Sequence, residues 1–536
     1  MDGVTTEDPG NLRRYLPHLV VFISSMGVMI IELVASRLIS KYFGSSLYTW
    51  TGIIGVVLGG ISLGNFIGGR LADRFSPRNI IAILLLIASF LTFLVLVLDL
   101  LLFRIMDRGA FTPATAGMVI RSLLLVLILF FLPSTALGTV SPVMAKYALE
   151  GSSRVGNTVG SIYAVSAIGS IVGTFLSGYV LIPLLGITTI VIVVGSLLAL
   201  LALVMGRLRA VSLSWILLIL VGLLLHLRSD QVFGSTKNLL YPETEGSTVL
   251  HRSDSRYSHI EVRDLNRGGR RERILIQDAL IHNRYDPDAP DELLYLYEQL
   301  FRALTWRQAV KRAVPASSAA FRTLTLGAGG CVFPLFLERN YPNSENQVVE
   351  IDPAVLKVAR DFFDLSENSS ILQVVADARN YVAYLQGKER FEIIYLDAFN
   401  SYSIPYHLTT LEFTRQVAAL LVPDGLVMAN CIDIFDHGRF LNAYLNTMAR
   451  VFPYTAVYAD TTYSPQRRAT FVIAAAFQPI GEAGEELYLD TGRRIGRRLS
   501  DDQLVDLRRR NGDGILSDNY APVENLIAPV FLRSVD

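Results

Sequence analysis

The sequence has little cysteine and no excess of either charge. Its 536 residues include only two cysteines, Cys331 and Cys431, too few for a disulfide framework or a zinc site. We therefore expect reduced or buried thiols and no metal site. Basic residues (Lys plus Arg) and acidic residues (Asp plus Glu) both number 48, so the formal net charge is zero. This balance says nothing about nucleic acid or acidic partners, and we expect no nucleic-acid binding.

The N-terminus lacks the features of a cleavable signal peptide. Residues 1–12 are polar and acidic, and the first apolar run is too long for the core of a signal. That run ends in Glu32-Leu-Val-Ala-Ser-Arg37, not in a small-residue cleavage site. We therefore interpret it as a membrane segment.

Long apolar runs fill the first part of the chain. A membrane-spanning helix needs about 20 apolar residues. The sequence therefore predicts a multi-pass α-helical membrane domain over residues 1–230, in contact with a lipid bilayer, at the cell membrane. The seven predicted spans are 16–40, 48–70, 79–103, 117–140, 157–184, 187–205 and 211–227.

Glycine is concentrated in two of these spans. The second span contains Gly64 and Gly68 at the GxxxG spacing that lets helix backbones approach closely. Shifting the chain by 105 residues places these glycines on Gly169 and Gly173 of the fifth span. The match indicates a duplicated three-helix unit, as in transporters.

Ionisable residues inside an apolar run are candidates for function. Glu32 lies within the first span, where it should face protein or water. It could equally form a structural pair with a neighbouring helix. The segment Gly68–Arg74 resembles a short loop of major-facilitator transporters, and the alternative is a charged end to a helix.

The charge bias of the loops and the expected function predict opposite sides of the membrane for the C-terminal domain. Most of the lysines and arginines between the spans would lie on one side, which the positive-inside rule makes cytoplasmic. With seven spans the C-terminal domain would then face away from the cytoplasm. A domain that uses a cytosolic nucleotide is instead expected inside.

The remaining chain predicts a soluble α/β structure. Residues 231–315 predict a small β-rich module, followed by a helix from Asp291 to about Val310. Over 316–536 strands alternate with helices, which predicts a parallel, Rossmann-like sheet. Its five strands are expected at 324–326, 347–350, 372–375, 391–396 and 425–430.

Polar residues and glycines follow these strands, where α/β sheets bind ligands. Gly327, Gly329 and Gly330 form a turn that allows close approach to a ligand. Glu350, 20 residues after Gly330, is placed to accept both ribose hydroxyls. Asp377, followed by Ala378, can face the adenine amino group. Since no third glycine completes GxGxxG, an adenosyl group without a pyrophosphate fits better than a dinucleotide.

Several of these segments resemble the spermidine synthase family, in its membrane-fused branch. The resemblance covers about residues 245–475 and rests on the motifs Leu326–Gly330, Val349–Pro353, Asp377-Ala378 and Leu396–Phe399. It implies a spermidine-synthase-like Rossmann domain and transfer of an aminopropyl group from decarboxylated S-adenosylmethionine to putrescine or a related amine. The donor is a co-substrate, and no cofactor is expected to stay bound.

The same resemblance assigns roles to the site. Asp397 is expected to keep the attacking amine deprotonated, which makes it the catalytic residue. Glu350, Asp377, Ala378 and the three turn glycines are expected to bind the donor. Substrate-binding positions are expected at Tyr257, Tyr295, Asp397 and Asn400, although the tyrosines could be core residues. Family relatives also lead us to expect a homo-oligomer.

Other positions depart from the family pattern. Gly330 stands where the family has an aspartate for the cofactor's free amine, and Asn400 replaces a second aspartate. Ser258 and His282 replace glutamines. Because each change removes a contact for a cationic chain, three hypotheses stay open. They are a membrane-bound aminopropyltransferase, an S-adenosylmethionine-dependent methyltransferase or other acceptor transferase, and a non-catalytic transporter-like or complex-forming membrane protein.

Overall fold

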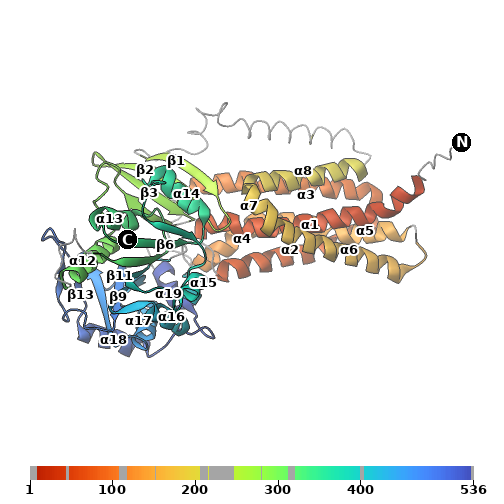
Figure 1. The fold of residues 1–536 in the computed structure, drawn as a ribbon. Helices are drawn as coiled ribbons and strands as arrows, with labels where there is room; N and C mark the ends of the chain where they lie inside the picture. Colours follow the sequence, from red (N-terminus) through yellow and green to blue (C-terminus); the bar gives the residue numbers. More distant parts are fainter. Residues whose placement is uncertain are drawn as a thin grey trace. The chain divides into compact units, whose positions relative to one another are not determined.

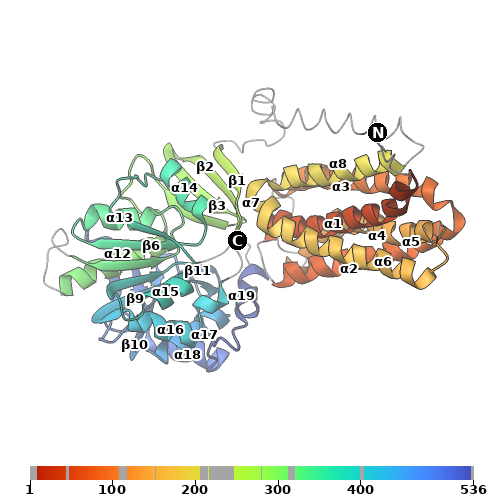
Figure 2. The same cartoon turned by 45° about the vertical axis from the view of Figure 1, so that its right-hand side comes forward.

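The computed structural model describes residues 9–43, 47–107, 118–150, 152–205, 215, 247–278, 280–311, 320–398 and 404–532. The chain forms two compact units, one before and one after residue 244 (Figures 1 and 2). The predicted domain limits at 230 and 315 lie outside the described residues and stay predictions.

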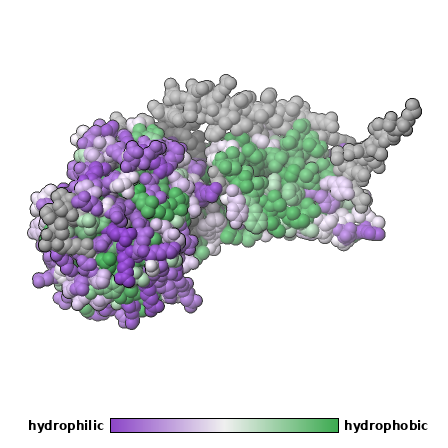
Figure 3. All heavy atoms as spheres, viewed as in Figure 1, coloured by the Kyte–Doolittle hydropathy of each residue, from purple (hydrophilic) through white to green (hydrophobic). Residues whose placement is uncertain are grey.

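The described residues of the first unit form helices joined by short turns. Six stretches of its described helices are long and apolar enough to cross a membrane. They coincide with the first six predicted spans, while the seventh (211–227) lies outside the described residues except for Trp215. In Figure 3 the visible surface of this unit is largely hydrophobic. The helices are α1 Pro9–Phe43, α2 Leu47–Arg74, α3 Pro77–Asp107, α4 Met118–Gly138, α5 Val140–Leu149, α6 Val155–Leu176, the π-helical η1 Ser177–Leu181, α7 Ile182–Leu184 and α8 Ile187–Met205.

Glycines bring pairs of these helices into backbone contact. A Cβ atom added at Gly64 of α2 would lie 2.2 Å from the carbonyl oxygen of Thr135 on α4. A Cβ atom at Gly169 of α6 would lie 2.4 Å from the carbonyl oxygen of Phe22 on α1. Any side chain at these positions would push the helices apart, which explains the glycines physically.

The two contacts are equivalent under the predicted repeat. The second helix of each three-helix group packs on the first helix of the other group, α2 on α4 and α6 on α1. The third helices, α3 and α8, pack on each other, and Ser89 Oγ donates a hydrogen bond to the Gly195 carbonyl at 2.7 Å. Figures 1 and 2 both show α3 and α8 side by side. Such a reciprocal exchange is the arrangement expected of a duplicated unit.

Membrane orientation stays a prediction, because it depends on the seventh span. Glu32 lies in the middle of α1 with a partly buried side chain. This position suits either of its two predicted roles.

The second unit contains two sheets. A four-stranded antiparallel sheet, in the order β1-β2-β3-β4, precedes helix α12. The nine-stranded sheet has the order β12-β13-β10-β11-β9-β8-β5-β6-β7. The strands are β1 Ser247–Asp254, β2 His259–Arg267, β3 Arg270–Gln277, β4 Leu280–Tyr285, β5 Arg322–Leu326, β6 Glu345–Glu350, β7 Leu372–Val375, β8 Phe391–Leu396, β9 Leu421–Ile434, β10 Tyr454–Asp460, β11 Arg468–Ala476, β12 Glu486–Tyr488 and β13 Arg494–Arg498.

The predicted parallel sheet is confirmed. Strands β7, β6, β5, β8 and β9 pair in parallel, and all five predicted strands are present. The antiparallel strands β11, β10, β13 and β12 extend the sheet beyond the prediction. Buried aliphatic and aromatic residues cover both faces of the sheet. The helices are α12 Leu296–Lys311, α13 Val332–Asn340, α14 Pro353–Phe362, α15 Ala378–Leu385, η3 Tyr406–Leu408, α16 Leu411–Ala419, α17 Arg439–Ala449, α18 Asp501–Asn511 and α19 Val523–Leu532.

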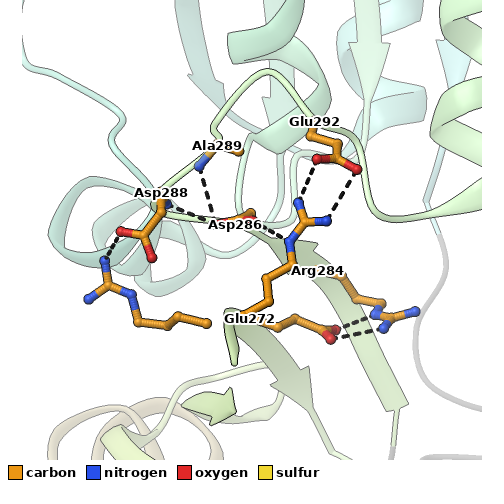
Figure 4. Close-up of polar contacts among 8 residues, drawn as sticks. Glu272, Arg284, Asp286, Asp288, Ala289 and Glu292 are labelled. Carbon is orange, nitrogen blue, oxygen red and sulfur yellow. Dashed lines mark hydrogen bonds and ion pairs between the residues drawn. The ribbon is translucent and has the colours of Figure 1, made fainter. Parts of the chain in front are cut away.

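The predicted start of the helix at Asp291 is wrong. Helix α12 begins only at Leu296. The five preceding residues are instead held by other contacts. Asp291 accepts a hydrogen bond from Arg339 at 2.6 Å, and Glu292 pairs with Arg270 at 2.8 Å (Figure 4). These tertiary ion pairs hold the segment in a non-helical conformation.

Candidate functional site

The carboxyl ends of four parallel strands meet at one edge of the large sheet. β5 ends before Gly327, β6 ends at Glu350, β7 ends two residues before Asp377, and β8 ends before Asp397. A cavity of about 370 Å³ lies at this edge. It is lined by eight of the residues predicted for the site, which are Tyr257, Tyr295, Gly327, Gly329, Glu350, Asp377, Ala378 and Asp397.

The turn after β5 requires glycine for steric reasons. Gly327 has φ +97°, and a Cβ atom there would lie 2.4 Å from the carbonyl oxygen of Asp397. Gly329 has φ +49°, and its Cβ atom would lie 2.2 Å from Asn283 Oδ1. Both conditions exclude ordinary side chains. The turn therefore presents bare backbone to the cavity.

Gly330 was predicted to bind the donor, but it is not among the residues that line the cavity. Its backbone N–H donates to Asn283 Oδ1 at 2.5 Å. A Cβ atom at Gly330 would lie 3.1 Å from the Phe363 ring. An aspartate here would be crowded by Phe363 and Asn283, so its absence fits the local packing. Asn400 lies outside the described residues, and its role stays a prediction.

Glu350 is oriented by two backbone groups. Its Oε2 accepts a hydrogen bond from Ala328 N and its Oε1 accepts one from Asp352 N, both at 3.0 Å. Burial raises its pKa, while these N–H groups act in the opposite direction. Each carboxylate oxygen keeps a further lone pair that can accept a hydroxyl proton. The arrangement suits a pair of ribose hydroxyls.

Asp377 occupies the cap position of α15. One carboxylate oxygen accepts the backbone N–H of Asn380 at 2.9 Å, and the other lies 3.2 Å from His407 Nε2. His407 also lines the cavity, and its carbonyl accepts a hydrogen bond from Arg379 at 3.1 Å. The sequence analysis missed His407 because only the fold brings η3 beside α15.

Asp397 is held by two side chains from other parts of the fold. Tyr297 donates its hydroxyl proton to Oδ2 at 2.9 Å, and Asn430 Nδ2 donates to Oδ1 at 2.8 Å. Desolvation raises the pKa of Asp397 to about 6, and both hydrogen bonds oppose this shift. A carboxylate that is ionised above about pH 6 can accept a proton at neutral pH. Tyr297 and Asn430 were not predicted as site residues.

The two tyrosines predicted to bind the substrate, Tyr257 and Tyr295, lie in the cavity wall. Tyr257 is 39% exposed, whereas the Tyr295 hydroxyl donates to the Ile281 carbonyl at 2.7 Å. Burial raises the pKa of Tyr295, so its phenol stays neutral. Both side chains present aromatic surface to the cavity.

The cysteines take no part in this site. Both thiols are free and buried, and burial raises their pKa values. Among the described residues no group of three or more His, Cys, Asp or Glu side chains could hold a metal ion.

Comparisons with known proteins agree with this geometry. Residues 331–478 match the family model described as the spermine/spermidine synthase domain. A polyamine aminopropyltransferase from Vibrio vulnificus is 37% identical over 121 residues, 22% of this chain and 40% of that protein. One from Chromobacterium violaceum is 30% identical over 152 residues, 28% of this chain and 54% of that protein.

A methyltransferase is also similar to part of the chain. The N-terminal histidine N-methyltransferase from Emericella nidulans is 27% identical over 226 residues, 40% of this chain and 39% of that protein. In all three comparisons the chain matches only about half of the relative's length or less.

The second unit is a Rossmann-like domain with a cavity at the carboxyl ends of its parallel strands. Its strand-end glycines and acids occur in the order of one family, and the family model covers its central part. These comparisons support the spermidine synthase family for the C-terminal α/β domain of this chain.

Proposed function

We propose that the protein is a membrane-bound aminopropyltransferase that uses decarboxylated S-adenosylmethionine as donor and an amine as acceptor. The observation that carries the proposal is the single cavity that joins Asp397 to Glu350 and Asp377. Six apolar helices long enough to span a membrane support attachment to the bilayer. The predicted homo-oligomer remains part of the proposal.

In the proposed reaction the acceptor nitrogen attacks the methylene carbon next to the donor's sulfonium. A carbon–nitrogen bond forms, the carbon–sulfur bond breaks, and its electron pair stays on sulfur as methylthioadenosine leaves. Asp397 accepts the proton that the ammonium must lose before attack. Because the sulfonium is already a good leaving group, the protein's main tasks are alignment and proton removal.

The other residues position the donor. Glu350 accepts hydrogen bonds from the ribose hydroxyls, and Asp377 accepts a hydrogen bond from the adenine amino group. The backbone of Gly327 and Gly329 lies against the adenosyl moiety. Tyr297 and Asn430 orient the Asp397 carboxylate toward the acceptor nitrogen.

A second candidate is methyl transfer from S-adenosylmethionine. It is favoured by Gly330, where no acid stands to repel the donor's carboxylate, and by Asn283, which fills the adjacent space. The similar methyltransferase makes the same domain compatible with this chemistry.

Mass spectrometry of the purified full-length protein distinguishes these candidates. Decarboxylated and intact S-adenosylmethionine are offered with amines in separate tubes. Methylthioadenosine with an aminopropylated amine supports the main proposal, whereas S-adenosylhomocysteine with a methylated product supports the second. Failure to bind methylthioadenosine or S-adenosylhomocysteine would reject both and favour a non-catalytic membrane role.

A further inference from the structure

One part of the cavity carries very little charge. This part, which we call the acceptor half, is formed by the four-stranded sheet, by Tyr295 at the start of α12, and by β9 and β11. Its wall combines apolar and aromatic side chains with uncharged polar ones, and it includes Tyr257, Gln277, Ile281, Tyr295, Ile432 and Arg468. Glu350 and Asp377 belong to the other half, where the donor is proposed to bind.

Among the described lining residues, Asp397 faces the acceptor half, whereas Asp352 caps α14 and accepts hydrogen bonds from Ala354 N at 2.9 Å and from Ser255 Oγ. His282 is uncharged, because burial lowers its pKa to about 4. The undescribed residues that adjoin the lining residues in sequence, 279 and 399–403, are Ala, Phe, Asn, Ser, Tyr and Ser, and none of them is an acid. Among the described lining residues, Asp397 is therefore the carboxylate that this half offers to an ammonium group.

Acids close to this half are engaged elsewhere. Glu272 pairs with Arg284 (Figure 4), and Glu261 pairs with Arg252. Asp278 accepts the backbone N–H of His259 at 2.9 Å and does not line the cavity.

Glu298 cannot supply the second carboxylate either. It is 0% exposed, and its two carboxyl oxygens form no hydrogen bond within 3.5 Å to a described residue. Burial first, and then the nearby Asp397, raise the pKa of Glu298 well above its ordinary value, although Asn283 lies close enough to lower it slightly. Glu298 does not line the cavity, so it presents no carboxylate to a cation there.

Arg468 adds a positive group instead. Arg468 lies on β11, opposite Ile434 of β9. Four residues further along β11, Val472 lies opposite Asn430, whose side chain donates a hydrogen bond to Asp397. At a rise of about 3.4 Å per residue, this separation is roughly 14 Å along the strand. Arg468 takes part in other interactions, but a guanidinium has five N–H donors. A chain of about five carbons plus the arginine's own reach spans this distance.

We propose that the acceptor is a monoamine, with one ammonium group beside Asp397 and an apolar or anionic far end near Arg468. A diamine such as putrescine would bury its second ammonium without a carboxylate and close to a guanidinium, which is costly. This inference rests on the proposed function and narrows its substrate class.

Three acceptors of matched length test the proposal: putrescine, pentan-1-amine and 5-aminopentanoate. They differ only at the far end, which is an ammonium, a methyl group or a carboxylate. With the full chain and decarboxylated S-adenosylmethionine, we expect kcat/KM for the two monoamines to exceed that for putrescine by about tenfold or more. An equal or higher value for putrescine overturns the proposal.

Two variants of Arg468 isolate its contribution. Arg468→Met should lower the ratio of 5-aminopentanoate to pentan-1-amine turnover, because only the carboxylate uses the guanidinium. Arg468→Glu should raise the relative turnover of putrescine. If neither ratio changes, Arg468 does not select the acceptor and the far-end assignment is wrong.

A binding measurement separates this inference from the proposed function. Calorimetry in the presence of methylthioadenosine ranks the three amines without any turnover. Tighter binding of the monoamines supports the inference even if no transfer occurs, and tighter binding of putrescine contradicts it. Absence of methylthioadenosine binding contradicts the proposed function, and with it this inference.

Discussion

The two units of this protein use glycine for different purposes. In the helical unit, Gly64 and Gly169 let one helix backbone lie against another, so their role is packing. In the α/β unit, Gly327 and Gly329 adopt positive φ angles and leave space at the edge of a cavity. The number of glycines in a segment therefore does not show whether they serve packing or a binding site. The neighbouring atoms and the φ angle at each glycine show it. It also predicts that substitutions in one unit affect stability and those in the other affect chemistry.

The largest expected effect is the loss of turnover in Asp397→Asn. Removing the proton acceptor should lower kcat by about 10²–10⁴-fold, the range typical of general bases. Methylthioadenosine affinity should change little, because Asp397 is assigned to the acceptor. Steady-state kinetics and calorimetry on the same preparation test both statements. Turnover equal to that of the unmodified protein would remove Asp397 from the mechanism.

A smaller effect is expected from Glu350→Gln. The amide keeps the size of the side chain but loses the charge and one acceptor for the ribose hydroxyls. Methylthioadenosine should bind about 10- to 100-fold more weakly, since hydrogen bonds to charged groups contribute roughly 1.5–3 kcal/mol. Calorimetry measures this change. Glu345→Gln, on the exposed start of the same strand, is the matched control and should leave the affinity unaltered.

In the helical unit, Gly64→Ala tests the packing role. Its new Cβ atom would meet the Thr135 carbonyl, so we expect destabilisation by about 1–3 kcal/mol. Gly55→Ala on the same helix is the control, because nothing lies within 4 Å of its Cβ position. Thermal unfolding in detergent should separate the two variants, while methylthioadenosine binding stays the same in both. Equal melting temperatures would contradict the close backbone contact.

The dependence of stability on pH should show the cost of burying Asp397. Its folded pKa of about 6 lies above the value of about 3.9 expected in the unfolded chain. Between these values the folded state holds a proton that the unfolded state has lost, so the free energy of unfolding should fall as pH rises from about 4 to 6. The contribution is at most about 2–3 kcal/mol. Asp397→Asn should remove it, so this variant should be the more stable protein at pH 8.

The smallest effect is expected from Tyr297→Phe. The lost hydroxyl donates to Asp397 and lowers its pKa, so the acidic limb of the kcat/KM profile should move to higher pH by less than about one unit. The maximal rate should fall by less than about tenfold. A limb that stays in place would show that Tyr297 does not interact with the titrating group.

Much of the fold was predictable from local patterns. Apolar runs of membrane-spanning length located the six described apolar helices, and strand–helix alternation located the five parallel strands. The error at Asp291 arose because Arg339 and Arg270 hold residues 291 and 292 out of the helix. Ion pairs between distant segments leave no local signal.

The site was predictable only where its residues follow strands. Gly327, Glu350, Asp377 and Asp397 are strand-end residues, and the carboxyl ends of parallel strands meet at one edge, so the sequence alone determined that they lie together. Tertiary structure decided the rest. It brought Tyr297 and Asn430 onto Asp397, His407 onto Asp377, and Arg468 into the cavity wall. Their spacing along the chain bears no relation to their contacts, because side-chain contact across a sheet depends on strand order and register.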